Sequence, residues 1–175
     1  PALRQAHRAP RDALTRAAGA EVTSAPMAVN TSYAGRTYPP GEVYEVSAEK
    51  IRELAEATAS THPAHTDPAA ARALGYPGVV APPTFAVVIA QRAEAAYVQD
   101  PDAGIDFSRV VHADERFTHH RPIVAGDRLT PTLHVDSVTE RGPLAMVTTR
   151  VEIADDDGAP VATVVSTLAV RGEGA

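Results

Sequence analysis

The sequence contains no cysteine and no tryptophan, and aromatic residues make up only 5% of its 175 positions. The lack of cysteine excludes disulfides, zinc ribbons and thiol catalysis, and it favours a cytoplasmic protein. Because aromatic side chains are so few, aliphatic residues must fill the core. Hydrophobic residues account for 44% of the chain, an ordinary share for a globular protein, and the length suits one domain.

Long apolar runs and an excess of positive charge are also missing. No apolar stretch reaches the roughly 18 residues that a transmembrane helix needs, and the N-terminus lacks the apolar core of a signal peptide. The formal net charge is −6, whereas nucleic-acid binding needs a basic patch. We therefore expect neither a membrane nor a nucleic acid as partner, although a local basic cluster could still hold a substrate phosphate.

Residues 1–26 differ in composition from the rest, with arginines spread among many alanines and little apolar periodicity. Such a composition is compatible with a transit peptide. We favour instead a misassigned start or an added leader, with Met27 as the initiator. The sequence therefore predicts a poorly ordered extension over 1–26 and a single domain over 27–172.

Capping and turn signals divide the domain into helices followed by strands. Ser47 is a good N-cap for a helix over 48–59, and Asp67 caps a short helix that Gly75 ends. Turn signals, the alternation of apolar and polar residues, and short apolar runs predict the strands. We expect them at 43–46, 107–118, 129–138, 144–153 and 161–170.

A second long helix is predicted over 84–97. Its first half is apolar all round, which is typical of a helix buried on every side, and Gln91, Arg92 and Glu94 mark the end that emerges. An apolar helix followed by antiparallel strands indicates an α+β hot-dog fold, in which the sheet wraps around the long helix. Other α+β folds share this order of elements.

Three segments carry a family resemblance. Residues 62–67 read His-Pro-Ala-His-Thr-Asp, residues 74–82 read Leu-Gly-Tyr-Pro-Gly-Val-Val-Ala-Pro, and residues 116–129 carry Arg-Phe and then His-Arg-Pro-Ile-Val-Ala-Gly-Asp-Arg-Leu. Together they resemble the MaoC-like, or FAS1-like, dehydratase family over about 27–172. The likeness is to its N-terminal, substrate-binding branch, which includes subunits of mycobacterial (3R)-hydroxyacyl carrier-protein dehydratases and UPF0336-type actinobacterial proteins.

The resemblance implies chemistry on a β-hydroxyacyl thioester. Dehydration needs a base for the α-proton, an acid for the leaving hydroxyl and donors for the thioester oxygen. The family's catalytic His falls on His65, the Asp five residues before it falls on Ser60, and the motif's Asn falls on His62. A serine cannot replace a carboxylate as acid or base, so the catalytic pair is incomplete.

The expected oxyanion site is altered as well. The family places His-Gly before the buried helix, where backbone N–H groups face the thioester, and here Pro82 and Pro83 stand instead. Proline has no N–H, so Thr84 is the remaining donor. Phe85, Val88 and Ile89 are expected to lie in the core, and some of them, with Phe85 and Val88 as the candidates, to line an acyl tunnel as well.

These departures imply a substrate-binding, catalytically incomplete subunit of a heterodimer in fatty-acid metabolism, completed by a MaoC-like partner. Three alternatives stay open: a self-sufficient R-specific hydratase using His65 with Ser60 or His62, a non-enzymatic thioester-binding protein, and a hot-dog thioesterase with Glu94 as its carboxylate. Alone, the chain could form a homodimer, since hot-dog domains pair into one continuous sheet.

The remaining polar candidates concern the carrier of the acyl group. His119, His120 and Arg121 form a small basic cluster that either meets the phosphates of coenzyme A or of an acyl carrier protein, or is a solvated strand end. No third ligand with metal-ligand spacing accompanies His62 and His65. We therefore expect no metal and no cofactor beyond the thioester carrier itself.

Overall fold

The computed structural model describes residues 29–172, and the extension predicted over 1–26 lies outside these residues. Within them, antiparallel strands form one sheet in the order β1-β3-β4-β5-β2. The strands are β1 (Tyr44–Glu45), β2 (Val110–His119), β3 (Arg128–Arg141), β4 (Leu144–Asp155) and β5 (Pro160–Arg171). The last four confirm the strands predicted in the second half of the chain.

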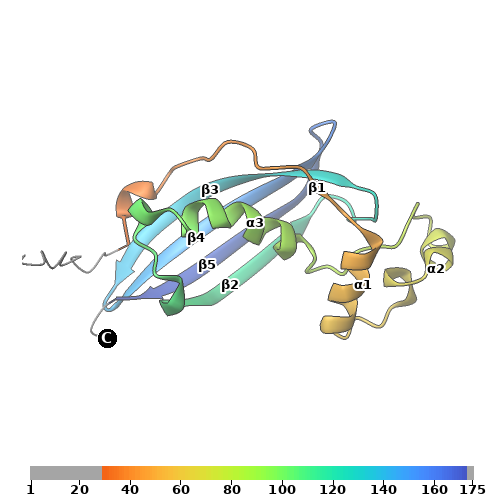
Figure 1. Ribbon diagram of the computed structural model, residues 1–175, viewed down its shortest axis with the longest axis horizontal. Coiled ribbons are helices and arrows are strands. Elements are labelled where there is room, and N and C mark those ends of the chain that lie inside the picture. Colours follow the sequence, from red (N-terminus) through yellow and green to blue (C-terminus); the bar gives the residue numbers. More distant parts are fainter. Residues whose placement is uncertain (1–28, 173–175) are drawn as a thin grey trace, which may run out of the picture.

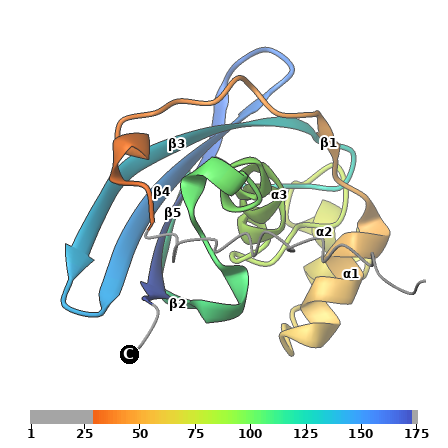
Figure 2. The same cartoon turned by 60° about the vertical axis from the view of Figure 1, so that its left-hand side comes forward.

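Three α-helices of the described residues accompany the sheet. They are α1 (Ala48–Ala57), α2 (Pro68–Ala73) and α3 (Ala86–Val98), with 3-10 turns at Thr31–Tyr33, Pro63–His65, Pro101–Ala103 and Phe107–Arg109. Figures 1 and 2 show the sheet curled around α3, while α1 and α2 lie together beyond one end of it. This is the α+β hot-dog fold that the sequence predicts.

The predicted caps explain where the first two helices begin and end. The Ser47 side chain accepts the N–H of Lys50 at the start of α1, and Asp67 accepts the N–H of Ala69 at the start of α2. Gly75 follows α2 with φ of 89°, a left-handed conformation that costs glycine little.

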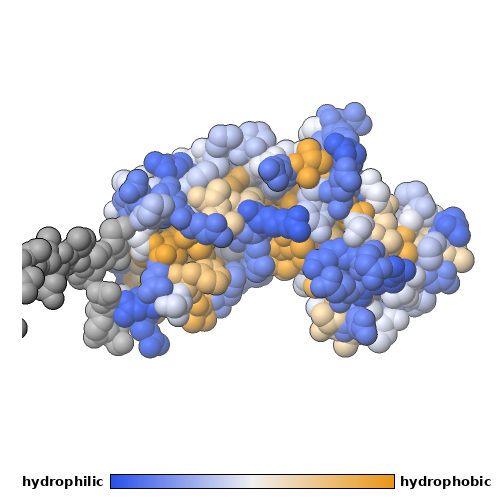
Figure 3. Space-filling model, viewed as in Figure 1, coloured by the Kyte–Doolittle hydropathy of each residue, from blue (hydrophilic) through white to orange (hydrophobic). Residues whose placement is uncertain are grey.

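The long helix differs from its prediction in two respects. It begins at Ala86 rather than at residue 84, because the N–H of Phe85 donates to the carbonyl of Pro82 in a turn that precedes the regular helix. It is also not buried on every side: Ile89 is fully buried against the sheet, whereas Val87 and Val88 on the other side are half-buried. Figure 3 shows apolar patches on the face that carries α3, beside hydrophilic side chains.

Glu94 is a further correction. The sequence places it at the emerging end of the helix, beside Gln91 and Arg92, which are indeed exposed. Glu94 is only 5% exposed and accepts a hydrogen bond from Thr149 Oγ1 at 2.6 Å. This hydrogen bond from Thr149 on β4 offsets part of the free-energy cost of burying the polar side chain.

The two edges of the sheet differ. The segment from Gly35 to Gly41 covers the β3 edge, where the N–H of Gly35 donates to Val135 and the N–H of Gly41 donates to Pro131. Strand β2 lies at the opposite edge and pairs only with β5 among the described strands. Its outer side therefore presents unpaired backbone groups, which natural proteins usually cover.

Candidate functional site

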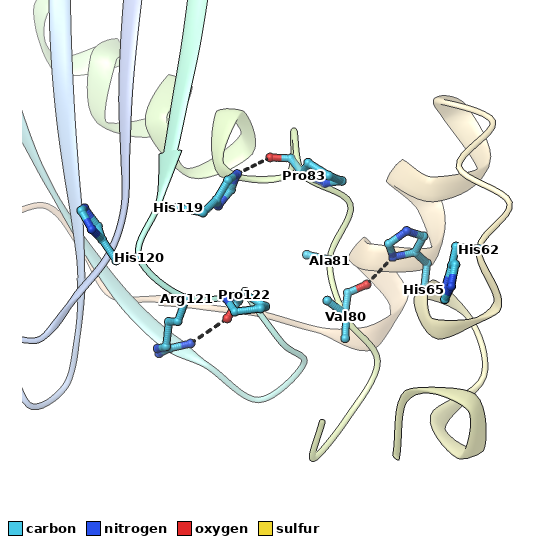
Figure 4. A pocket seen from close by; sticks show the side chains of 9 residues that line it. All are labelled: His62, His65, Val80, Ala81, Pro83, His119, His120, Arg121 and Pro122. Carbon is cyan, nitrogen blue, oxygen red and sulfur yellow. Dashed lines mark hydrogen bonds between the residues drawn. The ribbon is translucent and has the colours of Figure 1, made fainter. Parts of the chain in front are cut away.

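An open pocket of about 520 Å³ lies at the start of α3, beside the end of β2. Three segments form it: the turn around Pro63–His65, the approach to α3, and the chain that follows β2 (Figure 4). Its lining consists of His62, His65, Val80, Ala81, Pro83, His119, His120, Arg121 and Pro122. The pocket thus brings together six of the side chains singled out from the sequence.

His65 is held by the segment that leads into α3. Its Nδ1 donates to the carbonyl of Val80 at 2.6 Å, and the N–H of Val80 donates to the carbonyl of Ala64 at 2.9 Å. Because the carbonyl can only accept, the proton of the neutral imidazole stays on Nδ1, and Nε2 keeps its lone pair. His65 can therefore accept a proton or a hydrogen bond through Nε2.

His62 has a structural task in the same turn. Its Nδ1 accepts the N–H of Ala64 at 3.2 Å, so the side chain caps the 3-10 turn Pro63–His65. The rings of His62 and His65 lie 5.9 Å apart, edge to face. No group of three histidine, aspartate or glutamate side chains among residues 29–172 is placed to hold a metal ion.

A second imidazole holds the other side of the approach segment. His119 Nε2 donates to the carbonyl of Pro83 at 2.8 Å, and its ring stacks on Phe117. Figure 4 shows His65 and His119 on opposite sides of the segment that carries Val80 and Pro83. Two imidazole–carbonyl bonds thus fix the chain just before the helix.

The start of α3 offers a backbone donor just ahead of the helix, the N–H of Thr84. Pro82 and Pro83 have none, and the N–H of Thr84 donates to no acceptor in the part of the chain that the structure describes. Phe85 is fully buried and packs its edge against Tyr44, with ring centroids 6.3 Å apart. The structure therefore places Phe85 in the core, and neither it, Thr84 nor Val88 is among the residues lining the pocket.

Ser60 is placed away from the pocket lining. It follows α1, where its N–H donates to the carbonyl of Ala55 at 2.7 Å and its hydroxyl lies 2.9 Å from Thr58 Oγ1. Ala59, immediately before it, has φ of 52°. Ser60 thus closes the end of a helix, and its hydrogen bonds go to Ala55 and Thr58 rather than to His65.

Arg121 is already paired. Its Nη1 donates to Asp127 Oδ2 at 2.8 Å and its Nη2 to Asp155 Oδ2 at 3.4 Å. The bond to Asp127 chiefly raises the pKa of Arg121, and the N–H of Ala159 chiefly lowers the pKa of Asp155, with Arg121 adding to that shift. A phosphate would have to compete with two carboxylates for this guanidinium. His119 already donates to the Pro83 carbonyl, which leaves His120, whose Nε2 lies 3.5 Å from Thr163 Oγ1, as the freer donor of the basic cluster.

The sequence reasoning missed the carbonyls of Val80 and Pro83, which orient the two imidazoles. Backbone groups leave no signal in residue identity. The sequence reasoning also did not recognise the pair of Arg121 and Asp127, which are six residues apart. Gly126 lies between them, and its φ of 97° marks the turn that brings them together.

No helix among residues 29–172 is long and apolar enough to cross a membrane.

Glu94, the carboxylate of the thioesterase alternative, lies about 15 Å beyond Thr84 along the helix, at about 1.5 Å per residue. It faces the sheet interior and does not line the pocket. The pocket lining contains no carboxylate at all.

Comparisons with known proteins agree with this architecture. The protein-family model described as FAS1-like, dehydratase domain region matches residues 32–164. A UPF0336 protein of Saccharopolyspora erythraea is 52% identical over 146 residues, which cover 83% of this chain and 94% of that protein.

Two solved structures are similar in both sequence and fold. The C-terminally truncated HadBC complex of Mycobacterium tuberculosis, a (3R)-hydroxyacyl-ACP dehydratase, contains a chain that is 35% identical, with a TM-score of 0.70 and coverage of 78% of this chain and 96% of that one. A MaoC-like dehydratase is 34% identical, with a TM-score of 0.75 and coverage of 81% of this chain and 43% of that one. The pocket residues all fall within the matched span, and the chain belongs to the family of FAS1-like dehydratase domains.

Proposed function

We propose that this chain is the substrate-binding, catalytically incomplete subunit of a (3R)-hydroxyacyl-thioester dehydratase in fatty-acid metabolism. The observation that carries the proposal is a pocket with an oriented imidazole, that of His65, and no carboxylate in its lining. General acid–base dehydration needs two proton-transfer groups on one substrate. The motif's second position, Ser60, carries no carboxylate and lies at a helix end.

The pocket and the start of α3 beside it suit binding of a thioester. The N–H of Thr84 can donate to the thioester oxygen at the helix N-terminus, and His65 Nε2 can accept from a substrate hydroxyl. In this proposal His120 donates to a phosphate group of the coenzyme A or carrier-protein moiety, and His119 can join it only by giving up its bond to the Pro83 carbonyl. No cofactor beyond that carrier enters the proposal, and the cytoplasmic location expected from the sequence remains a prediction.

The partner in this proposal is a MaoC-like chain that contributes the intact Asp and His. Strand β2 supports such an arrangement because its outer edge is open in the described chain, whereas the β3 edge is covered. A second hot-dog sheet added beside β2 would cover the exposed backbone groups. HadBC, which contains the similar chain, is itself a complex, and this chain could form a homodimer when it is expressed alone.

The test measures hydration of a trans-2-enoyl-CoA by the purified chain, alone and mixed with a MaoC-like chain that has the intact motif. We expect binding without turnover for the chain alone and turnover in the mixture. His65→Ala in this chain should raise the KM of the mixture and leave kcat largely unchanged. His134→Ala serves as a control, because this histidine lies on β3 outside the pocket.

The self-sufficient R-specific hydratase is the alternative that the lone pair on His65 Nε2 favours. Turnover by the chain alone that disappears in His65→Ala would establish it and defeat the proposal. Binding without turnover in both preparations would indicate a non-enzymatic thioester-binding protein. Release of free coenzyme A, abolished by Glu94→Gln, would indicate a thioesterase.

A further inference from the structure

A largely buried polar row crosses the apolar face of the sheet beneath α3. Thr149 on β4, Ser166 on β5 and Glu115 on β2 are direct neighbours in the strand register. Thr149 Oγ1 donates to Glu94 on α3 at 2.6 Å, and Ser166 Oγ donates to Glu115 Oε1 at 3.1 Å. Two carboxyl and two hydroxyl groups thus meet at one level of the helix–sheet interior.

The rows on either side are largely apolar. Toward the pocket, Val151, Val164 and Phe117 occupy the corresponding positions, and on the far side Val147 and Leu168 do. The four aliphatic residues are buried and Phe117 is half-buried. A polar row at this place costs desolvation free energy that an apolar row would avoid, and folding gains nothing obvious from it.

The row lies at a defined depth from the pocket. Along β2, Glu115 is four residues from His119, or about 13 Å at about 3.3 Å per residue. Along α3, Glu94 is ten residues from Thr84, or about 15 Å at about 1.5 Å per residue. An extended alkyl chain gains roughly 1.3 Å per carbon, given single bonds of about 1.5 Å, so about ten to twelve carbons span this depth.

Glu115 is the member of the row that borders open space. Its side chain is 22% exposed, and half-buried Phe117 and Val88 lie between its level and the pocket. Burial chiefly raises the pKa of Glu115, the bond from Ser166 lowers it, and the nearby Glu94 raises it. Among the described residues that face it, only His112, 4.0 Å away, is a potential cation.

We infer that this polar row sets the length of the acyl chain that the protein accepts. This inference rests on the proposed function. The acyl group runs from the pocket along the apolar surface between α3 and β2 as far as Glu115. Chains beyond about twelve carbons then press methylene groups against two carboxyl groups and desolvate them without offering any hydrogen bond in return. Each methylene before the row gains binding free energy, and those beyond it gain none.

The test compares the dissociation constants of octanoyl-, dodecanoyl- and hexadecanoyl-CoA by calorimetry on the full chain. We expect tighter binding of dodecanoyl- than octanoyl-CoA and no further gain for hexadecanoyl-CoA. In Glu115→Leu, the preference for hexadecanoyl- over dodecanoyl-CoA should rise by about tenfold, the effect of burying roughly two methylene groups. The double variant Glu94→Leu/Thr149→Val removes both partners of the deeper bond and should shift the same ratio in the same direction.

Two controls separate a length effect from a general change. Glu115→Gln keeps an acceptor for Ser166 and should keep the wild-type profile, and Glu53→Leu removes an exposed carboxylate on α1. Wild-type length profiles in both apolar variants would overturn the inference and leave the proposed function standing. Failure of the wild-type chain to bind any of the three thioesters would overturn both.

Discussion

The ring of His65 and the backbone of Val80 are joined by a 2.6 Å hydrogen bond, with Nδ1 donating to the carbonyl. The bond sets the tautomer of the imidazole and also ties the turn Pro63–His65 to the segment that enters α3. The chemistry expected of His65 and the position of the helix start therefore depend on the same contact.

The first prediction separates these two roles. His65→Ala should lower the free energy of unfolding by about 1–3 kcal/mol, because the partly buried Val80 carbonyl loses its donor. His65→Asn, whose Nδ2 can still donate, should recover part of this stability without restoring proton transfer. Urea denaturation of the three proteins measures the effect, and equal midpoints for wild type and His65→Ala would show that the bond contributes nothing.

The second prediction concerns the pair of Arg121 and Asp127. Asp127 is only 13% exposed and also accepts the N–H of Val124 at 2.9 Å. Arg121→Ala should cost about 1–3 kcal/mol of stability, toward the lower end because the guanidinium itself is 35% exposed.

A double-mutant cycle with Asp127→Ala checks the pairing. The coupling free energy should be about 1 kcal/mol, within the usual range for residues in contact. If Arg121 instead serves mainly to bind a phosphate, Arg121→Ala will weaken coenzyme A binding strongly and leave stability almost unchanged.

The third prediction follows from the raised pKa of Glu115, whose main cause is burial. The folded protein holds this proton more tightly than the unfolded chain does. The protonated Glu115 therefore contributes its full share to the stability of the fold below 4.5, the pKa of the unfolded chain. This contribution is lost as the pH rises through the higher pKa of the folded protein. As the pH rises from 4, Glu115→Gln should therefore become more stable relative to wild type. The measurement is the difference between the two melting temperatures at each pH. A difference that stays constant with pH would contradict the prediction.

Much of the fold could be predicted because its signals are local. Ser47 and Asp67 cap their helices as expected, and the apolar–polar alternation places β3 to β5 within a few residues of their bounds. The strand expected from residue 107 begins at Val110, because Asp106 caps a 3-10 turn over Phe107–Arg109. A short cap of this kind competes with a strand start and is hard to distinguish from it in sequence.

The site was less predictable because its contacts are not local. The burial of Glu94 depends on Thr149, 55 residues later in the chain. Ser60 and His65 are close in sequence, yet the end of α1 holds Ser60 in its own hydrogen bonds. Residue identity suggested which side chains have useful chemistry, whereas their partners follow from strand register and loop packing.

The last prediction concerns the tyrosines at the C-terminal end of α3. Tyr97 is fully buried, and its hydroxyl has no hydrogen-bond partner within the described chain, although its ring packs against that of Tyr33 at 5.4 Å. Burial chiefly raises the pKa of Tyr97 to about 12. Tyr97→Phe removes this unpaired hydroxyl and keeps the ring, so it should stabilise the protein by about 1 kcal/mol.

Tyr33→Phe is the matched variant with the opposite expectation. The Tyr33 hydroxyl donates to Asp100 Oδ2 at 2.8 Å, and this bond chiefly lowers the pKa of the Asp100 carboxyl. Removal of the hydroxyl should destabilise the fold at neutral pH, and the loss should shrink as the pH falls and Asp100 becomes protonated. Thermal unfolding of both variants across pH tests the pair, and a loss of stability in Tyr97→Phe would mean that a bound water or a partner group satisfies the Tyr97 hydroxyl.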